Sequence, residues 1–372
     1  MKKLLSISAA AILGFCAYAQ SPKPEYNLFY EYYFENREFD YKVDAPVYSG
    51  TINAVAFSPS AGLSFMQDDD IHHRLSLGID IRRDMGGRNK RYMDELTVYY
   101  DGHVRLKKDA VFEGIIGIFP RRFSEGEYSR AFFSDSLRFT DRNLEGALLK
   151  YKTKDFYAEL GADWMGRRDT FIKERFMIFS AGDYRLRDWI GIGWSGTFYH
   201  YAGSEMAPGV VDNHLFNPYV KINLFEKGKR RFLKLKFGLM VSYQRDRERE
   251  AQANIKLGYE SVLSGRFKSF SLENTLFAGR GFQYLYNAED LGGNKYGNNL
   301  YFGSPFYSYK VYDMLEAAWT PRLGRSISLS IKARFHFCQD GYIGNTQMLG
   351  FIFDLESRRS SRWPDGRIGD VD

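Results

Sequence analysis

The sequence from Ser326 to Phe337 reads Ser-Ile-Ser-Leu-Ser-Ile-Lys-Ala-Arg-Phe-His-Phe, in which polar and apolar residues alternate strictly. Because successive side chains of a β-strand point to opposite faces, this stretch predicts a strand with one apolar face and one charged face. A soluble sandwich also alternates, so the length and repetition of the pattern must decide between the two architectures. The alternation recurs along nearly the whole chain, which favours a transmembrane β-barrel.

The N-terminus has the three regions of a secretory signal peptide. Met1-Lys2-Lys3 is followed by an apolar run that ends in Ala17-Tyr18-Ala19. We therefore expect a signal peptide over residues 1–19 and a location in the outer membrane of a Gram-negative bacterium. Cys16 raises the alternative of a lipoprotein, but a bulky phenylalanine precedes it, where a lipid-modified cysteine that resembles the lipobox type has a small residue.

The composition excludes several classes of protein. The chain of 372 residues is 17% aromatic and has a mean hydropathy of −0.42. A barrel needs only every second residue to be apolar, which explains this low hydropathy. A formal net charge of +6, which includes Lys2 and Lys3 of the signal region, does not suggest nucleic-acid binding. Cys338 is the only cysteine after residue 19, so neither a disulfide nor a cysteine-rich metal site is expected, and no cofactor is predicted.

Tight, charged turns alternate with longer connections along the chain. The turns are predicted at 68–70, 107–109, 153–155, 182–184, 227–229, 264–266 and 322–324. The other connections are expected near 37–58, 84–93, 122–142, 166–172, 202–213, 246–249, 281–305 and 340–345. This order predicts an all-β fold, a transmembrane antiparallel up-and-down β-barrel of about 16 strands over residues 20–357. The turns would be periplasmic, and residues 358–372 would form a polar periplasmic tail.

The polar face of the predicted strands carries the residues that would line a pore. They are Arg74, Arg82, Arg105, Lys234, Lys236, Lys256, Lys332 and Arg334, with Asp80, Asp101, Glu159, Asp163, Glu260 and Glu273. Charges at this density need water, and a barrel of about 16 strands is wide enough for an aqueous channel. The alternative is that the charges pair across strands and plug the lumen. The sequence leaves both alternatives open.

The connection after the fifth predicted strand is rich in arginine. It contains Arg121, Arg122, Arg130, Arg138 and Arg142. If this loop folds into the barrel, it would form a cationic constriction with a weak preference for anions. If it stays outside, its arginines are simply solvated. The acidic residues in the same stretch weaken any strong selectivity, and the two positions of the loop remain open alternatives.

Two other features of the sequence are candidate sites. The loop 281–305 is rich in Tyr, Phe, Asn and Gly, which could stack on and hydrogen-bond to a sugar or simply pack on the barrel rim. The histidines His72, His103 and His336, with Asp101 beside His103, are the only plausible general bases or metal ligands. No nucleophile or ligand spacing accompanies them. The sequence therefore predicts no catalytic residues, no metal site and no enzyme.

Some short motifs resemble those of a known group of proteins. They are the Ala19-Gln20 junction, Phe133-Ser134-Asp135-Ser136-Leu137-Arg138-Phe139, Gly161-Ala162-Asp163-Trp164 and Arg175-Phe176. With them the chain resembles porin-like outer-membrane barrel proteins of Gram-negative bacteria of the Bacteroidota type, over essentially its whole mature length. Such families commonly end on an aromatic residue, whereas this chain ends in a polar tail.

The resemblance and the residue pattern together predict a passive, porin-like channel for small hydrophilic solutes. Its partners would be outer-membrane lipid and those solutes, without nucleic acid, and a homo-oligomer is expected by analogy only. The first alternative is a structural or partner-binding barrel without transport, and the second is a barrel hydrolase. The sequence names neither the solute, nor the oligomeric state, nor a role for the tail.

Overall fold

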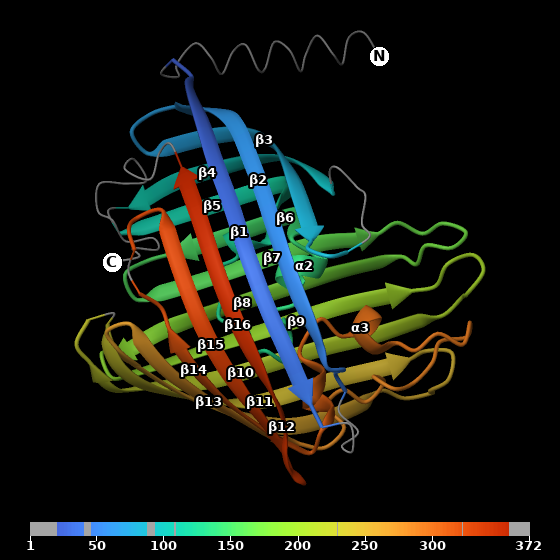
Figure 1. Cartoon of the computed structure of the whole chain (residues 1–372). Coiled ribbons are helices and arrows are strands. Elements are labelled where there is room, and N and C mark those ends of the chain that lie inside the picture. Colours follow the sequence, from blue (N-terminus) through green and yellow to red (C-terminus); the bar gives the residue numbers. More distant parts are fainter. Residues whose placement is uncertain are drawn as a thin grey trace.

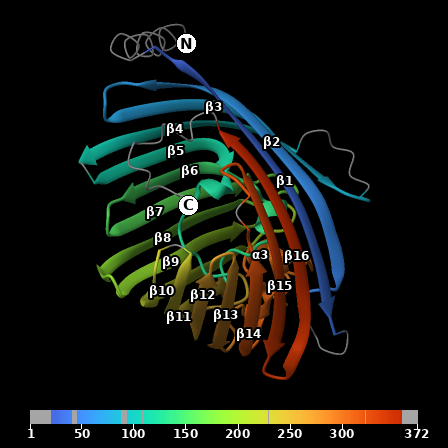
Figure 2. The same cartoon turned by 60° about the vertical axis from the view of Figure 1, so that its left-hand side comes forward.

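The protein is a closed β-barrel. The computed structural model describes residues 21–40, 46–87, 94–107, 109–228, 230–321 and 323–356. These residues form sixteen strands, and each strand pairs antiparallel with its neighbours in the chain. β1 also pairs with β16, which closes the sheet (Figures 1 and 2). The predicted all-β antiparallel barrel of about 16 strands is confirmed. The predicted signal peptide and C-terminal tail lie outside the described residues.

The first half of the wall consists of β1 (Lys23–Phe39), β2 (Gly50–Met66), β3 (Ile71–Asp84), β4 (Glu95–Lys107), β5 (Ala110–Pro120), β6 (Asn143–Lys152), β7 (Phe156–Gly166) and β8 (Arg175–Arg187). The second half consists of β9 (Ile190–Ala202), β10 (Val210–Glu226), β11 (Arg231–Asp246), β12 (Asn254–Phe267), β13 (Phe270–Gly279), β14 (Val311–Trp319), β15 (Ile327–Cys338) and β16 (Gly341–Glu356). The connections that lead from an odd-numbered to an even-numbered strand lie at one end of the barrel, here called the loop end, and the longest ones are among them. The other connections lie at the opposite end, here called the turn end.

Short helices occur in two of the long connections. They are η1 (Arg121–Phe123), α2 (Leu137–Thr140), α3 (Gly297–Leu300) and η2 (Pro305–Ser308). Among the described residues, no helix has the length and apolar character needed to cross a membrane.

The strand β15 shows how the alternating sequence becomes a two-faced wall. Ile331 and Phe335 on its apolar face are 47% and 40% exposed, although they are large hydrophobic residues. On the opposite face, Arg334 and His336 are only 9% and 4% exposed. The apolar side chains therefore point outward and the polar ones point into the barrel. This is the reverse of a soluble protein and is what a barrel in lipid requires.

The same outward-facing set recurs around the barrel. Large exposed hydrophobic side chains occupy alternate positions of many strands, among them Leu75, Leu77, Val98, Ile116, Leu160, Phe237 and Leu257. A continuous apolar surface of this extent marks contact with lipid or with a partner rather than with water.

Two of the predicted turns are displaced in the structure. The predicted turn 182–184 lies within β8, which continues to Arg187 and pairs Asp183 with Gly193 of β9. Asp183 lines a cavity in the lumen, so its polar character reflects the aqueous interior and not a turn. The predicted turn 264–266 also lies within a strand, and the chain reverses at Lys268, whose φ of 56° is the left-handed conformation of a tight turn.

The core of the protein lies inside the barrel. One buried cluster joins Phe119, Leu144 and Phe179 of the inner wall to Leu300 and Tyr301 of the loop between β13 and β14. A second cluster joins inner-wall residues of β10 to β15 to Phe132, Phe282, Phe306 and Tyr307 of the two long loops. Apolar residues at inward positions of β5, which blur the alternation there, are therefore explained by loops that fold into the lumen.

The outer surface provides a direct test of the membrane face. Replacing Leu77, in the middle of β3, by Arg is expected to lower the free energy of unfolding from lipid vesicles by about 2–4 kcal/mol. Leu323→Arg, at an equally exposed leucine in the connection between β14 and β15, should cost only about 0–1 kcal/mol. Urea titration of vesicle-embedded protein measures both, and an equal loss in the two variants would contradict the assigned lipid face.

Candidate functional site in the barrel lumen

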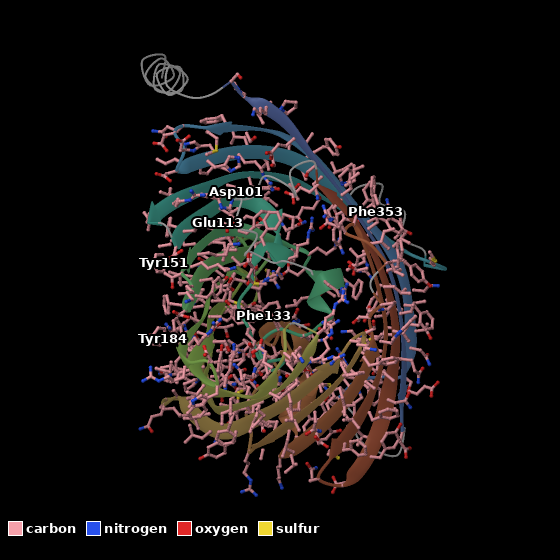
Figure 3. All side chains as sticks on the ribbon, turned by 90° about the vertical axis from the view of Figure 1, so that its left-hand side faces the viewer. Asp101, Glu113, Phe133, Tyr151, Tyr184 and Phe353 are labelled. Atoms are coloured by element: carbon pink, nitrogen blue, oxygen red, sulfur yellow. The ribbon has the colours of Figure 1, made fainter. Side chains whose placement is uncertain are left out.

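The loop that joins β5 to β6 lies inside the barrel. Figure 3 shows Phe133 well within the ring of strands, whereas Phe353 of β16 lies at the wall. The Phe133 ring packs against Tyr128 of the same loop and Phe179 of β8, with centroid distances of 4.9 and 5.9 Å. Of the two positions that the sequence left open for this loop, the structure has the inward one. The lumen is consequently narrower than its wall alone would make it.

Ion pairs attach this inward loop to the wall. Arg130 Nη2 lies 3.0 Å from Glu273 Oε1 of β13 and 3.4 Å from Glu316 Oε2 of β14. Arg142 Nε lies 2.8 Å from Asp80 Oδ2 of β3. These bridges reach opposite sides of the barrel, so the loop spans the lumen and is held from several directions.

The other three predicted constriction residues differ in their surroundings. Arg138 pairs with Glu31 of β1, and Arg121 Nη2 lies 2.8 Å from Asp163 Oδ2 of β7. Arg122 instead lies over the ring of Phe29, 4.0 Å from its centroid. Four of the five arginines thus have carboxylate partners on the wall. The inward loop therefore carries a network of mixed charge and not a ring of unpaired cations.

A carboxylate of the loop also pairs with cationic side chains of the wall. Glu127 lies 2.7 Å from Lys221 Nζ of β10 and 3.2 Å from Lys236 Nζ of β11. Burial alone would raise the pKa of the Glu127 carboxyl, but Lys236 and Lys221 outweigh it and lower that pKa to about 2. Glu127 is therefore ionised at neutral pH and attaches the loop to a side of the wall that its arginines do not reach.

The electrostatic environment of Asp141, at the end of the loop, is the opposite of that of Glu127 and raises the pKa of its carboxyl group. Burial and the neighbouring Asp163 and Glu95 carboxylates raise the pKa of Asp141 to about 6, although Arg121 acts to lower it. Three acidic groups thus converge at the loop end of the lumen, near Arg121 and Arg175.

Two large cavities remain on either side of the inward loop. The turn-end cavity has a volume of about 790 Å³ and is lined by charged residues that include Asp183, Lys221 and Lys236. The loop-end cavity has a volume of about 820 Å³ and is lined by residues of the loops and of β14 to β16. Arg130 and Thr275 line both cavities. The two spaces therefore approach each other at the Arg130 side chain and its carboxylate partners.

The predicted pore-lining residues all lie on the inner side of the wall. Those that border cavities are Lys234, Lys236, Glu260 and Glu273 at the turn end, Asp163 and Arg334 at the loop end, and Arg74 in a third cavity of about 180 Å³. Those that contact the inward loop are Arg82, Asp80 and Glu159. The others are Asp101, Lys332 and Lys256, which contact Arg74, Glu316 and Tyr284, and Arg105, which shares a strand face with Asp101. Their role in lining a pore stays a prediction.

The loop between β13 and β14 also folds against the inner wall. Its Tyr301 hydroxyl donates to Gln244 Oε1 of β11 at 2.6 Å, and Asn213 of β10 donates to the carbonyl of Leu300 at 2.7 Å. Its aromatic residues are thus mostly used to pack on one another and on the barrel. This is the simpler of the two interpretations that the sequence allowed.

The structure adds Glu113 to the pair Asp101 and His103 that the sequence singled out, which makes a cluster of metal-ligating side chains. Asp101, His103 and Glu113 each offer a ligand atom, and these atoms all lie within 4.8 Å of one another. His103 of β4 pairs directly with Glu113 of β5 across the hairpin, and both point into the lumen. Asp101 and Glu113 are labelled in Figure 3. The predicted turn at 107–109 already placed residues 103 and 113 at equal distances from it, which was the signal that could have found Glu113.

Comparison with solved structures supports the fold. Pseudomonas aeruginosa OprD is 12% identical, with a TM-score of 0.51, and the match covers 90% of this chain and 96% of that one. Pseudomonas aeruginosa OccK2 (OpdF) is 11% identical with the same TM-score, over 90% and 98% of the two chains. These neighbours are outer-membrane porins, so the resemblance to porin-like barrels is confirmed. At such low identity the likeness shows the fold alone.

Comparison with family models is more specific. The model described as lipid A 3'-O-deacylase-type matches residues 20–353. The chain belongs to this family. A search of curated protein sequences found no match. Because the family is named for an enzyme, the prediction that the chain is not an enzyme was wrong. Histidines without a neighbouring nucleophile were not enough to exclude catalysis, because the sequence could not show which groups other strands bring to them.

The contact between Glu127 and the two lysines predicts a pH response of the inward loop. Since its pKa falls from an ordinary 4.5 to about 2, Glu127 stabilises the inward position above pH 4.5 and loses this effect as the pH falls towards 2. Protection factors of residues 124–130, in the part of the loop that carries Glu127 and not Asp141, should therefore be similar in hydrogen exchange at pH 7 and 5 and lower at pH 3. Glu127→Gln should lower them at pH 7 and flatten the response, and unchanged protection in that variant would contradict the assignment.

Proposed function

We propose that the protein is a barrel of the Gram-negative outer membrane that conducts small hydrophilic solutes through a narrow passage in its lumen. The observation that carries this proposal is the pair of cavities that share Arg130 and Thr275. Each has room for many water molecules, and the two lie on either side of the inward loop. A continuous apolar outer surface, in contact with outer-membrane lipid, would keep this polar passage within the bilayer.

The charges at the narrowest part suit a passage for small polar solutes. Arg130 meets Glu273 and Glu316, and Arg334 pairs with Asp135 and Glu316 at the same place. Side chains of opposite charge in close contact offer hydrogen bonds to either end of a polar solute. A ring of side chains that all carry one sign of charge would instead select ions of the other sign. The weak preference for anions, expected from the arginines alone, therefore remains a prediction.

Single-channel recording in a planar bilayer tests the proposal. The mature chain should give steady openings, and Arg130→Ala should raise the conductance by about twofold or more because it removes the side chain between the cavities. Arg247→Ala is the matched control, since Arg247 pairs with Asp212 at the loop end and lines neither large cavity. Silent bilayers with folded protein, or equal conductance in both variants, would exclude this passage. The reversal potential in a salt gradient reports the sign of any preference.

The second candidate function is hydrolysis of an acyl ester of lipid A, and the family assignment favours it. The Nε2 atom of His103 lies 2.9 Å from Asp101 Oδ1, an arrangement that orients an imidazole as a general base. In that role His103 would take a proton from water as the water attacks the ester carbonyl, and a fatty acid and a free hydroxyl would be released. His103 faces the lumen and not the outer apolar surface, which is why we place this function second.

Release of fatty acid from lipid A in mixed micelles tests the second candidate. His103→Ala should reduce the rate by a factor of about 100 or more if His103 is the base. His336→Gln is the control, because His336 is also a buried lumenal histidine, but its two ring nitrogens contact the hydroxyl groups of Tyr312 and Thr346. No release by the wild-type protein, or full activity in His103→Ala, would rule out this role for the residue.

A further inference from the structure

We infer that Asp101, His103 and Glu113 form a binding site for a divalent cation of the zinc type on the lumenal face of β4 and β5. The three side chains come from adjacent positions of one antiparallel hairpin, with His103 directly opposite Glu113 and Asp101 two residues before His103 on the same face. The register of the hairpin therefore brings them together without any loop. The inference depends on neither of the functions proposed above.

The ligand atoms converge on one point. The His103 Nε2 atom lies 2.9 Å from Asp101 Oδ1 and 3.9 Å from Glu113 Oε1, so one ring nitrogen faces two carboxylates. Ligands bound to one zinc ion at about 2.0–2.2 Å lie roughly 3.3–3.6 Å apart when the geometry is tetrahedral. The observed separations bracket this value, and small side-chain rotations would bring all three atoms to coordination distance.

Neighbouring cations hold the carboxylates in the required orientation. Arg74 Nε lies 3.7 Å from Asp101 Oδ2, and Lys150 Nζ lies 3.0 Å from Glu113 Oε2. Each cation thus contacts the carboxylate oxygen that faces away from His103. The other oxygens, Oδ1 and Oε1, remain directed to the imidazole. Hydrogen-bonding groups behind the ligands play this orienting role in protein metal sites.

The charge balance around the cluster also favours a cation. Arg74 contacts Glu25 and Glu356 as well as Asp101. Lys150 contacts Glu125 as well as Glu113, and Lys152 contacts Glu125. The ion pairs named here join five carboxylates to three cationic side chains. A divalent cation would offset the excess of negative charge in a partly buried place, where charge interactions are stronger than in water.

A second imidazole lies beside the cluster, on the adjacent strand. His72 of β3 pairs with His103 of β4, and the centroids of the two rings are 5.9 Å apart. Imidazole nitrogens with carboxylate oxygens are a donor set that suits zinc, whereas magnesium and calcium prefer oxygen alone. With three protein ligands, the site matches the ligand number of a catalytic zinc centre.

Zinc titration of the untagged full chain, folded in detergent micelles, tests the inference. Isothermal titration calorimetry should give one tightly bound Zn²⁺ per chain for the wild-type protein and for the control His336→Gln. His103→Gln and Glu113→Gln should each weaken binding by about 100-fold. Folding of every variant is checked by its mobility on unheated and heated gels.

Two results would overturn the inference. One is a folded wild-type protein that binds no stoichiometric Zn²⁺, and the other is equal binding by the wild-type protein and a folded Glu113→Gln variant. Cobalt provides a second readout that needs no variant. The wild-type protein loaded with Co²⁺ should show the visible absorption bands of a four-coordinate or five-coordinate site, and the weak spectrum of octahedral Co²⁺ would count against a built site.

Discussion

Closure of the sheet is the constraint on which the rest of the structure depends. The ladder that joins β1 to β16, with Tyr32 opposite Phe351, leaves no free strand edge and separates an outside from an inside. Once sixteen strands are closed, the inside is wider than the wall side chains alone can fill. The two long loops fold into that space and build an apolar core there. The core of this protein is thus a consequence of the diameter of its wall.

The pairing of the lumenal charges also follows from closure of the sheet. Inside a narrow, partly dry space, an unpaired charge is costly, and each arginine of the inward loop but one therefore meets a carboxylate of the wall. Removing one partner would leave the other buried, so these pairs act together to hold the loop across the lumen. The same pairs divide the lumen into two cavities and place Arg130 between them. A channel, if it conducts, must pass this charged partition.

The family assignment and the lumenal geometry bear on different parts of the molecule. The family is named for the removal of an acyl chain from a lipid, whereas the cavities are suited to water and polar solutes. One lumenal cluster is relevant to both functions. It consists of Asp101, His103 and Glu113, and a histidine between two carboxylates can bind a cation or activate water. The site lies on rigid strands, so its geometry is set by the hairpin register and not by loop motion.

The sequence by itself determined the barrel, the approximate number of strands and the face to which each lumenal charge points, because side-chain direction in a strand depends only on alternation. It could not place the turn between β8 and β9, because Asp183 looks like a turn residue until its aqueous surroundings are known. Only the tertiary structure decided that residues 121–142 enter the lumen and that Arg130 meets Glu273 and Glu316. Those partners lie more than 140 residues away in the chain. Contacts of such range depend on how the closed wall brings distant strands together, and no local pattern records them.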